Sequence, residues 1–153
     1  MTDDKPLFEI IELLFFAYRD FIGDPDALLD QYAFGRAHHR VLHFVNRNPG
    51  MTVAELLDIL KITKQSLGRV LKELVEAGLI EQQTGEIDRR QRLLFATASG
   101  SALALRLAEP QSRRIDAALA GLGPEGAESA RKFLTMMINE DDRARAARSA
   151  AKP

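Results

Sequence analysis

The sequence centres on the stretch Thr63-Lys-Gln-Ser-Leu-Gly-Arg-Val-Leu-Lys-Glu-Leu-Val-Glu-Ala-Gly78, which predicts one helix with two distinct faces. Thr63 can cap its start, because a threonine oxygen accepts a hydrogen bond from an unpaired backbone N–H. Gly78 can end it, since glycine adopts the left-handed conformation without strain. Apolar residues recur at spacings of three and four, which gathers them on one stripe for the core: Leu67, Val70, Leu71, Leu74 and Val75.

The opposite face of this helix is polar and holds no acid near its start. Arginine can pair with guanine, glutamine with adenine, and serine with phosphate, so this face suits DNA. An ordinary solvated helix face is the alternative, although such a face usually mixes acids and bases. The candidate DNA-binding residues on it are Lys64, Gln65, Ser66, Arg69 and Lys72.

A second helix is predicted before this one and a hairpin after it. Thr52 and Glu55 fit a capping box that opens a helix running to Leu60, followed by a two-residue link. After Gly78 the sequence predicts two short strands joined by the charged turn 85–92. Helix, short turn, helix and hairpin is the order of a winged helix-turn-helix, which places one helix in a DNA groove.

The turn between the two strands carries three arginines within four residues, Arg89, Arg90 and Arg92. A structural turn needs glycine, asparagine or aspartate, and it has no use for an arginine cluster. Arginine suits a narrow minor groove, where the negative potential is deepest. Asp88 is expected to orient an arginine through a charge-assisted hydrogen bond. The three arginines are therefore candidate DNA-binding residues of a basic wing.

Residues 50–100 resemble the MarR family of bacterial transcriptional regulators. The resemblance is carried by residues 63–80, by Asp88-Arg89-Arg90, and by Ala96-Thr97-Ala-Ser-Gly100. The family pattern has Asp-x-Arg in the wing and Leu-Thr-x-x-Gly at the next helix, and here Ala96 replaces the leucine. The resemblance implies a dimer and a cleft between its dimerisation and DNA-binding parts. A small molecule, often aromatic or anionic, would bind in that cleft and shift the spacing of the two recognition helices.

Composition is that of an ordinary globular chain of 153 residues, with 46% apolar and 28% charged residues. No cysteine is present, which excludes disulfides, thiolate zinc sites and cysteine redox sensing. The net charge of −1 is unevenly spread: residues 1–30 hold two bases and eight acids, whereas residues 61–92 hold seven bases and five acids. DNA affinity follows the local field at the contact surface more than the whole-chain total.

A cytoplasmic location and no membrane contact are expected. Asp3 and Asp4 stand where a signal peptide would be basic. The strongest apolar run, Leu13–Ala17, is far too short to span a bilayer.

The first predicted helix, residues 7–22, is too apolar for a helix with a single buried stripe. A partner subunit is the expected cover, and a central core helix within one subunit is the alternative. The segment Gly23-Asp24-Pro25-Asp26 breaks this helix, and Asp24 or Asp26 is a candidate cap for a short turn after it.

A helix over residues 34–47 carries all three histidines. His39 and His43 are spaced to hold a metal on one helix face, but no third ligand is evident in the sequence. A polar surface or the lining of an effector pocket is the favoured role, since in the resembling family this helix borders the cleft. His39 and His43 are therefore the candidate effector-pocket residues, and no metal site or cofactor is predicted.

The C-terminal third is predicted to be helical from Ser99. Pro110 should kink or interrupt this helix, and Pro124 suits the first turn of a last one. Residues 141–153 are interpreted as a fraying helix end or a disordered tail.

No phosphate loop, nucleophile elbow or zinc-protease motif is present, so an enzyme is not expected. The predicted fold is mainly α: a single domain over 1–153, in which helices at 1–33 and 98–148 dimerise and 34–97 form a winged helix-turn-helix with a two-stranded β wing. The predicted function is sequence-specific binding of double-stranded DNA by a homodimeric transcriptional regulator. Ligand-responsive repression at a palindrome is the expected form of that regulation. The alternative function is a winged-helix module that contacts protein and never DNA.

Overall fold

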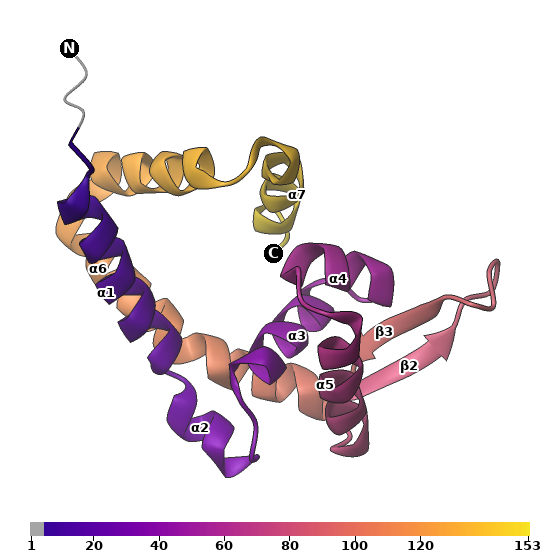
Figure 1. Ribbon diagram of the computed structural model, residues 1–153. Coiled ribbons are helices and arrows are strands. Elements are labelled where there is room, and N and C mark those ends of the chain that lie inside the picture. The colour runs from indigo at the N-terminus through magenta and orange to yellow at the C-terminus, as the bar shows by residue number, and fades with distance from the viewer. Residues whose placement is uncertain (1–4) are drawn as a thin grey trace.

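The computed structural model describes residues 5–153 and is mainly helical, with one small sheet (Figure 1). Asp3 and Asp4, on which the expectation of no signal peptide rests, lie outside the described residues. In chain order the elements are α1 (Phe8–Gly23), α2 (Asp26–Gln31), α3 (Arg36–Arg47), β1 (Met51–Thr52), α4 (Val53–Leu60), α5 (Lys64–Glu76), β2 (Ile80–Thr84), β3 (Arg92–Ala96), α6 (Ala98–Met137) and α7 (Glu140–Ala150).

The sheet is antiparallel with strand order β1-β3-β2. β2 and β3 form the predicted hairpin, in a register that pairs Ile80 with Ala96 and Thr84 with Arg92. The third strand, β1, was not predicted. It pairs Met51 with Leu94 and Thr52 with Leu93, which joins the start of α4 to the hairpin. Two residues are too few for a recognisable alternation, so only the pairing with β3 identifies this strand.

The core lies between α3, α4, α5, the sheet and the first turns of α6. Four of the five apolar residues predicted for the buried stripe of α5 are buried: Leu67, Val70, Leu71 and Leu74. Val75 is 37% exposed, so its prediction as a core residue was wrong. It lies in the last turn of α5, directly before the exposed residues Glu76, Ala77 and Gly78.

Thr97 and Gly100 lie where the start of α6 packs closely against the backbone of Gly78 and Leu79. The Thr97 hydroxyl donates to Gly78 O at 2.7 Å and accepts from Gly100 N at 3.0 Å, so it caps α6 and also ties it to the end of α5. A Cβ atom at Gly100 would lie 2.0 Å from the backbone oxygen of Leu79. The approach of α6 to this backbone therefore requires glycine.

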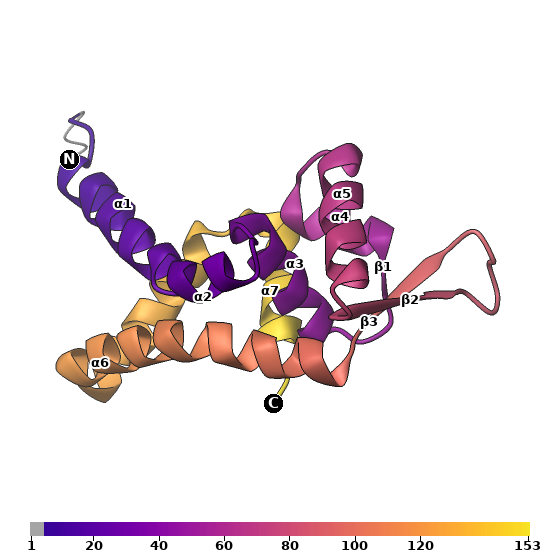
Figure 2. The same ribbon diagram turned by 90° about the horizontal axis from the view of Figure 1, so that it is seen from below.

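α1 runs beside α6, and most of its apolar side chains are exposed (Figures 1 and 2). Its one buried residue is Ile22, whereas Phe15 is 70% exposed. A central core helix within one subunit is therefore wrong. An apolar surface of this extent on a single chain is typical of a subunit interface.

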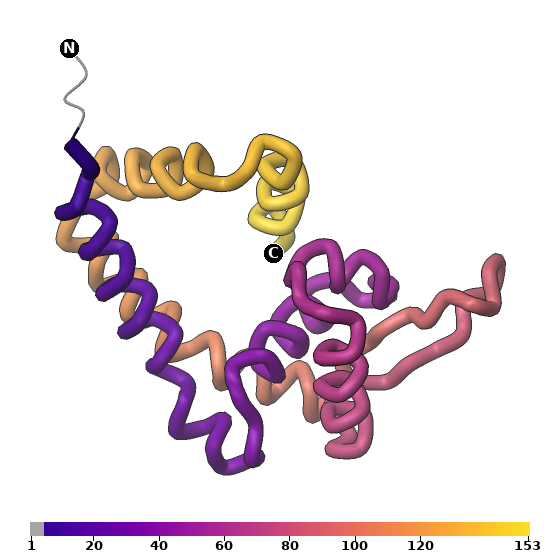
Figure 3. Tube along the Cα trace, in the orientation of Figure 1, coloured from indigo at the N-terminus to yellow at the C-terminus, as the bar shows by residue number. Residues whose placement is uncertain are grey.

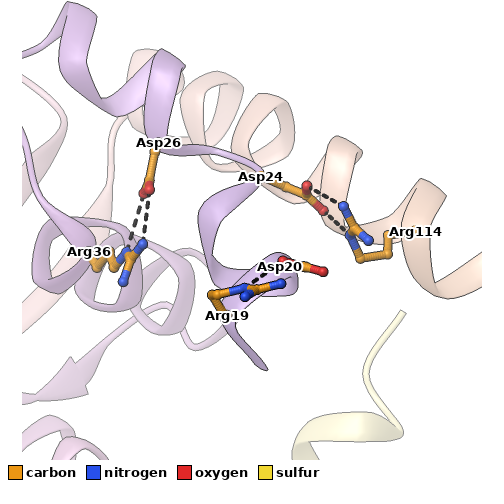
Figure 4. Close-up of polar contacts among 6 residues, drawn as sticks. All are labelled: Arg19, Asp20, Asp24, Asp26, Arg36 and Arg114. Atoms are coloured by element: carbon orange, nitrogen blue, oxygen red, sulfur yellow. Dashed lines mark hydrogen bonds and ion pairs between the residues drawn. The ribbon is translucent and has the colours of Figure 1, made fainter. Parts of the chain in front are cut away.

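Two ion pairs hold the junction of α1 and α2 (Figure 4). The Asp24 carboxylate accepts from Arg114 of α6 at 2.6 and 2.9 Å, and Asp26 accepts from Arg36 of α3 at 3.3 and 3.0 Å. The hydrogen bond from each arginine holds the pKa of its aspartate below the ordinary value. Neither aspartate caps α2, contrary to the expectation, because both carboxylates are engaged across helices instead.

α6 keeps helical backbone angles at Pro110, so of the two predicted effects, a kink or an interruption, the interruption was wrong. A proline inside a helix removes one hydrogen bond and crowds the preceding turn, which costs about 3 kcal/mol, yet the backbone stays helical here. The break falls at Gly123, whose φ of 78° only glycine adopts readily, and Pro124 then begins the second half of the helix as predicted. Figure 3 shows the chain changing direction there and returning toward α4.

The C-terminal segment is an ordered helix, α7, rather than a fraying end or a disordered tail. Arg47 donates to the backbone oxygens of Ser149, Lys152 and Pro153 at 2.5–3.0 Å. Arg145 pairs with Asp58 of α4 at 2.5 Å. These contacts join residues that are 87 to 106 positions apart in the sequence, which is why the local pattern did not predict them.

Candidate nucleic-acid interface

The start of α5 is built to present polar side chains outward. Thr63 caps the helix, with its hydroxyl oxygen accepting from Ser66 N at 3.1 Å. The buried stripe then fixes the rotation of the helix, so that its opposite face is exposed. All five residues predicted for DNA contact on this face are exposed: Lys64, Gln65, Ser66, Arg69 and Lys72. Gly68 lies among them, and a Cβ atom there would meet nothing within 4 Å.

Glu73 is the first acid of α5, and it points away from the polar face. Its Oε2 lies 2.6 Å from Nε2 of the buried His38 in α3. His38 Nδ1 accepts from Gly35 N at 3.0 Å, so Nδ1 carries no hydrogen and Nε2–H is the donor to Glu73. The ring is held further by stacking on Phe34, with centroids 4.6 Å apart. This neutral histidine therefore links α3 to α5 and withdraws a carboxylate from the polar face.

Loss of this link should be measurable in stability. Glu73→Ala is expected to lower the free energy of unfolding by about 1–2 kcal/mol, because it leaves the buried His38 Nε2–H without an acceptor. Glu73→Gln should lose less than half of that, since an amide oxygen still accepts from His38. Urea denaturation of both variants at equal concentration measures the difference. Equal losses in the two variants would mean that the hydrogen bond does not hold the helix.

The wing is a tight turn with an ordered arginine. The Asp88 carboxylate accepts from Arg90 N at 3.0 Å and from Arg90 Nε at 3.3 Å, as expected for an aspartate that orients an arginine. The Arg90 side chain is still 93% exposed, which leaves its terminal nitrogens free to contact a ligand. Arg89 and Arg92 are exposed as well.

The helix α5 and the wing, which is the β2–β3 hairpin, lie at one end of the molecule. Figures 1 and 2 show the β2–β3 hairpin projecting beyond α5, at the end of the chain fold opposite α1. The structure thus brings together the helix and wing residues that the sequence proposed. It also reveals His38 and Glu73 as positioning residues. No feature of the local sequence distinguished Glu73 from Glu76, the other acid of this helix, or marked His38 as its partner.

The two candidate effector residues lie apart from these elements. His39 is buried in α3, and burial first, then the charges of His43 and Arg40, lower the pKa of its imidazole. His43 is exposed and packs edge-on against Phe44. Neither lines the cavity of about 650 Å³ that lies between α7 and the helix-turn-helix. Within residues 5–153 no group of three or more histidines or acids is placed to hold a metal ion.

No helix in the part of the chain that the structure describes is both long and apolar enough to cross a lipid bilayer.

Comparison with known proteins gives consistent matches. Residues 34–91 match the model of the MarR family. The HTH-type transcriptional regulator PetP of Rhodobacter capsulatus is 46% identical over 136 residues, which cover 89% of this chain and 82% of that protein.

Solved structures with this fold span most of the chain. A putative MarR family regulator from Listeria monocytogenes, complexed with a 26mer DNA, superposes with a TM-score of 0.74 at 21% identity, covering 92% of this chain and 91% of the other. NadR in complex with 4-hydroxyphenylacetate superposes with a TM-score of 0.72 at 23% identity, covering 90% and 96%.

Proposed function

This chain belongs to the MarR family of transcriptional regulators, and on that premise we propose that it binds a palindromic DNA operator as a homodimer and represses transcription until a small molecule releases it. The observation that carries the proposal is the pairing of an exposed helix face without acids from Lys64 to Lys72 with a wing that exposes three arginines, at one end of the fold (Figure 1). Its relatives are regulators rather than enzymes. Binding to bacterial DNA would place the protein in the cytoplasm.

The recognition helix α5 and the β2–β3 wing would contact different parts of the DNA. Gln65, Ser66 and Arg69 of the recognition helix would reach base edges and phosphates in the major groove. Lys64 and Lys72 flank them and would contact phosphates. Arg90, held by Asp88, would enter the minor groove, with Arg89 and Arg92 adding positive charge along the backbone. The Listeria neighbour solved with DNA shares this fold, which supports the assignment.

Homodimerisation would complete the DNA-binding surface. The exposed apolar side of α1, together with α6 and the C-terminal helices, is the proposed interface, so that residues 1–33 and 98–148 dimerise while 34–97 bind DNA. Two recognition helices would then lie about 34 Å apart, one turn of DNA, and bind the two halves of a palindrome.

Phe15→Arg should convert the dimer to monomers or to aggregates, because it places a charge on the apolar face of α1 where Phe15 is 70% exposed. Ile87→Arg is the matched control, since Ile87 is equally apolar and fully exposed but lies at the wing tip. Sedimentation equilibrium at micromolar concentration should give twice the chain mass for wild type and for Ile87→Arg. A wild-type monomer would contradict the proposed assembly.

Ligand control is proposed from the same family membership. NadR was solved with an aromatic acid, 4-hydroxyphenylacetate, and it shares this fold. An aromatic or anionic effector is therefore proposed here, with His39 and His43 as candidate pocket residues. Such a molecule acts through different affinities for two spacings of the recognition helices.

The decisive experiment is a titration of the protein with the DNA upstream of its own gene and with a scrambled duplex of equal length. At physiological salt, the operator should bind at least a thousandfold more tightly than the scrambled DNA. The competing function, a module that contacts only protein, predicts no binding to either duplex. The three exposed arginines of the wing favour DNA over protein, because arginine suits the narrow minor groove, where the negative potential is deepest.

A further inference from the structure

Gly68 of α5 is a glycine that the fold itself does not require. Its backbone is helical, and it lacks the positive φ that Gly78 adopts just after the same helix. A Cβ atom at Gly68 would meet nothing within 4 Å, whereas at Gly100 it would lie 2.0 Å from the Leu79 oxygen. Neither backbone conformation nor packing against residues 5–153 therefore explains why this position lacks a side chain.

A glycine in the interior of a helix normally lowers stability. It loses more backbone entropy on folding than any other residue, and it leaves the helix backbone open to water. Alanine would fit at Gly68 and would form helix more readily. Glycine is favoured, however, where the backbone and a bound molecule approach each other closely. The missing side chain therefore points to a molecule outside the chain that approaches α5 at this position.

The surroundings of Gly68 indicate which molecule that is. On a helix, residues three and four positions apart are neighbours, so Lys64, Gln65 and Lys72 surround Gly68. These side chains and that of Arg69 are long, polar and exposed. Gly68 therefore leaves the helix backbone bare at the centre of the face that is proposed to contact DNA.

The bare position offers an apolar contact. Gly68 follows the first turn of α5, and at that place the backbone N–H is bonded within the helix to the carbonyl four residues earlier. A phosphate or a polar base atom would therefore find no free donor at Gly68, and the methylene group of its α carbon remains as the contact surface. The apolar group that base pairs display in the major groove is the C5-methyl of thymine.

We propose that Gly68 receives the C5-methyl group of a thymine in each half-site of the operator, which makes this glycine a specificity-determining residue. The proposal rests on the proposed binding of DNA through α5. Gln65, one turn earlier, can pair with adenine, so the two positions together would favour A·T base pairs at this point of the half-site. A side chain at Gly68 would occupy the place of the methyl group and hold α5 away from the base edges.

Gly68→Ala is the first test, because it adds a single methyl group. Titration at one salt concentration should show the operator binding at least about tenfold more weakly than to wild type, since Gln65 and Arg69 would be held away from base edges. A scrambled duplex should bind within about twofold of wild type, because non-specific binding depends on phosphate contacts. The midpoint of urea unfolding should rise, which excludes loss of folding as the cause.

Gly35→Ala is the matched control for this change. Gly35 is exposed, its φ of −108° suits alanine, and a Cβ atom there would meet nothing within 4 Å. It precedes α3, outside the recognition helix, the wing and the proposed dimerisation segments. Gly35→Ala should bind operator and scrambled DNA as wild type does. A loss of operator affinity equal to that of Gly68→Ala would overturn the proposal.

Uracil in the operator tests the thymine methyl group directly, because uracil lacks only that group. Each thymine of a half-site is replaced in turn, at the same position of both half-sites. One of these replacements should weaken binding of wild type by about fourfold per half-site, which corresponds to the burial of one methylene-sized group. The same replacement should strengthen binding of Gly68→Ala, since it removes the group that the added Cβ meets.

Contrary results would separate this proposal from the proposed function. If wild type is specific for the operator but Gly68→Ala binds it equally tightly, the proposal fails and the proposed function stands. If Gly68→Ala weakens both duplexes alike, Gly68 faces the sugar-phosphate backbone and thymine is not its ligand. If every uracil replacement changes both proteins by the same factor, no thymine methyl contacts Gly68. A wild type that binds both duplexes alike would overturn the proposed function, and this proposal with it.

Discussion

Gly100→Ala is expected to lower the free energy of unfolding by about 3 kcal/mol, the upper end of the usual cost of overpacking. The added Cβ would lie 2.0 Å from the Leu79 oxygen, so α6 and this backbone must separate. Leu79 O accepts from Thr97 N at 3.0 Å, and the Thr97 hydroxyl donates to the neighbouring Gly78 O. Separation would therefore break the two hydrogen bonds that attach α6 to the hairpin.

Gly68→Ala is the matched control for this change. Gly68 is also a helical glycine, but a Cβ atom there meets nothing within 4 Å. Alanine should raise the free energy of unfolding by about 0.5–1 kcal/mol, the difference in helix propensity. Urea denaturation at one protein concentration compares the two variants. If both stabilised the protein, close contact between α6 and Leu79 would not be a requirement of the fold.

Gln65→Ala and Arg69→Ala should each cost about 1–3 kcal/mol of binding free energy per half-site, and chiefly on the operator. Both side chains are exposed near the start of α5, where a recognition helix reaches base edges. Arg90→Ala should instead weaken binding to all sequences alike and lower the slope of log affinity against log salt by about one unit per subunit. Specificity should therefore fall for the helix variants and persist for the wing variant.

The measurement is a titration of each variant against operator and scrambled duplexes at several salt concentrations. Arg40→Ala is the control, because it removes an exposed arginine of α3 that lies outside the recognition helix, the wing and the proposed dimerisation segments. It should change neither the operator affinity nor the specificity ratio. The opposing hypothesis is that these side chains only add positive charge or polarity. Under it, the ratio of operator to scrambled affinity would be the same in all variants, and the helix would not recognise sequence.

The winged helix-turn-helix was largely predictable because its determinants are local. The recognition helix begins after Thr63 and ends before Gly78, as expected. Gly78 adopts a left-handed conformation with a φ of 75°. Asp88 orients Arg90 across two residues, and Thr97 caps α6 across three. Hydrogen bonds over such short separations follow directly from residue type and spacing.

Prediction failed where the determinant was a distant partner. Asp24 and Asp26 were expected to cap α2, but they pair instead with Arg114 and Arg36, which lie ninety and ten residues away in the sequence. Glu73 is an acid on a helix, which by itself predicts a solvent-exposed side chain, yet its carboxylate binds the buried His38. α7 is ordered by contacts with α3 and α4, although its own sequence resembles a frayed tail.

The sequence by itself determined most of the helices and the β2–β3 hairpin, which face of α5 is polar at its start, and that Asp88 orients an arginine of the wing. Periodicity, caps and turn residues act within a few positions, so they are written in the local sequence. Only the tertiary structure decided that Gly100 lies against Leu79, that His38 holds Glu73, and that α7 packs against α3 and α4. Each of these depends on which distant groups packing brings within hydrogen-bond distance, and no local pattern contains that information.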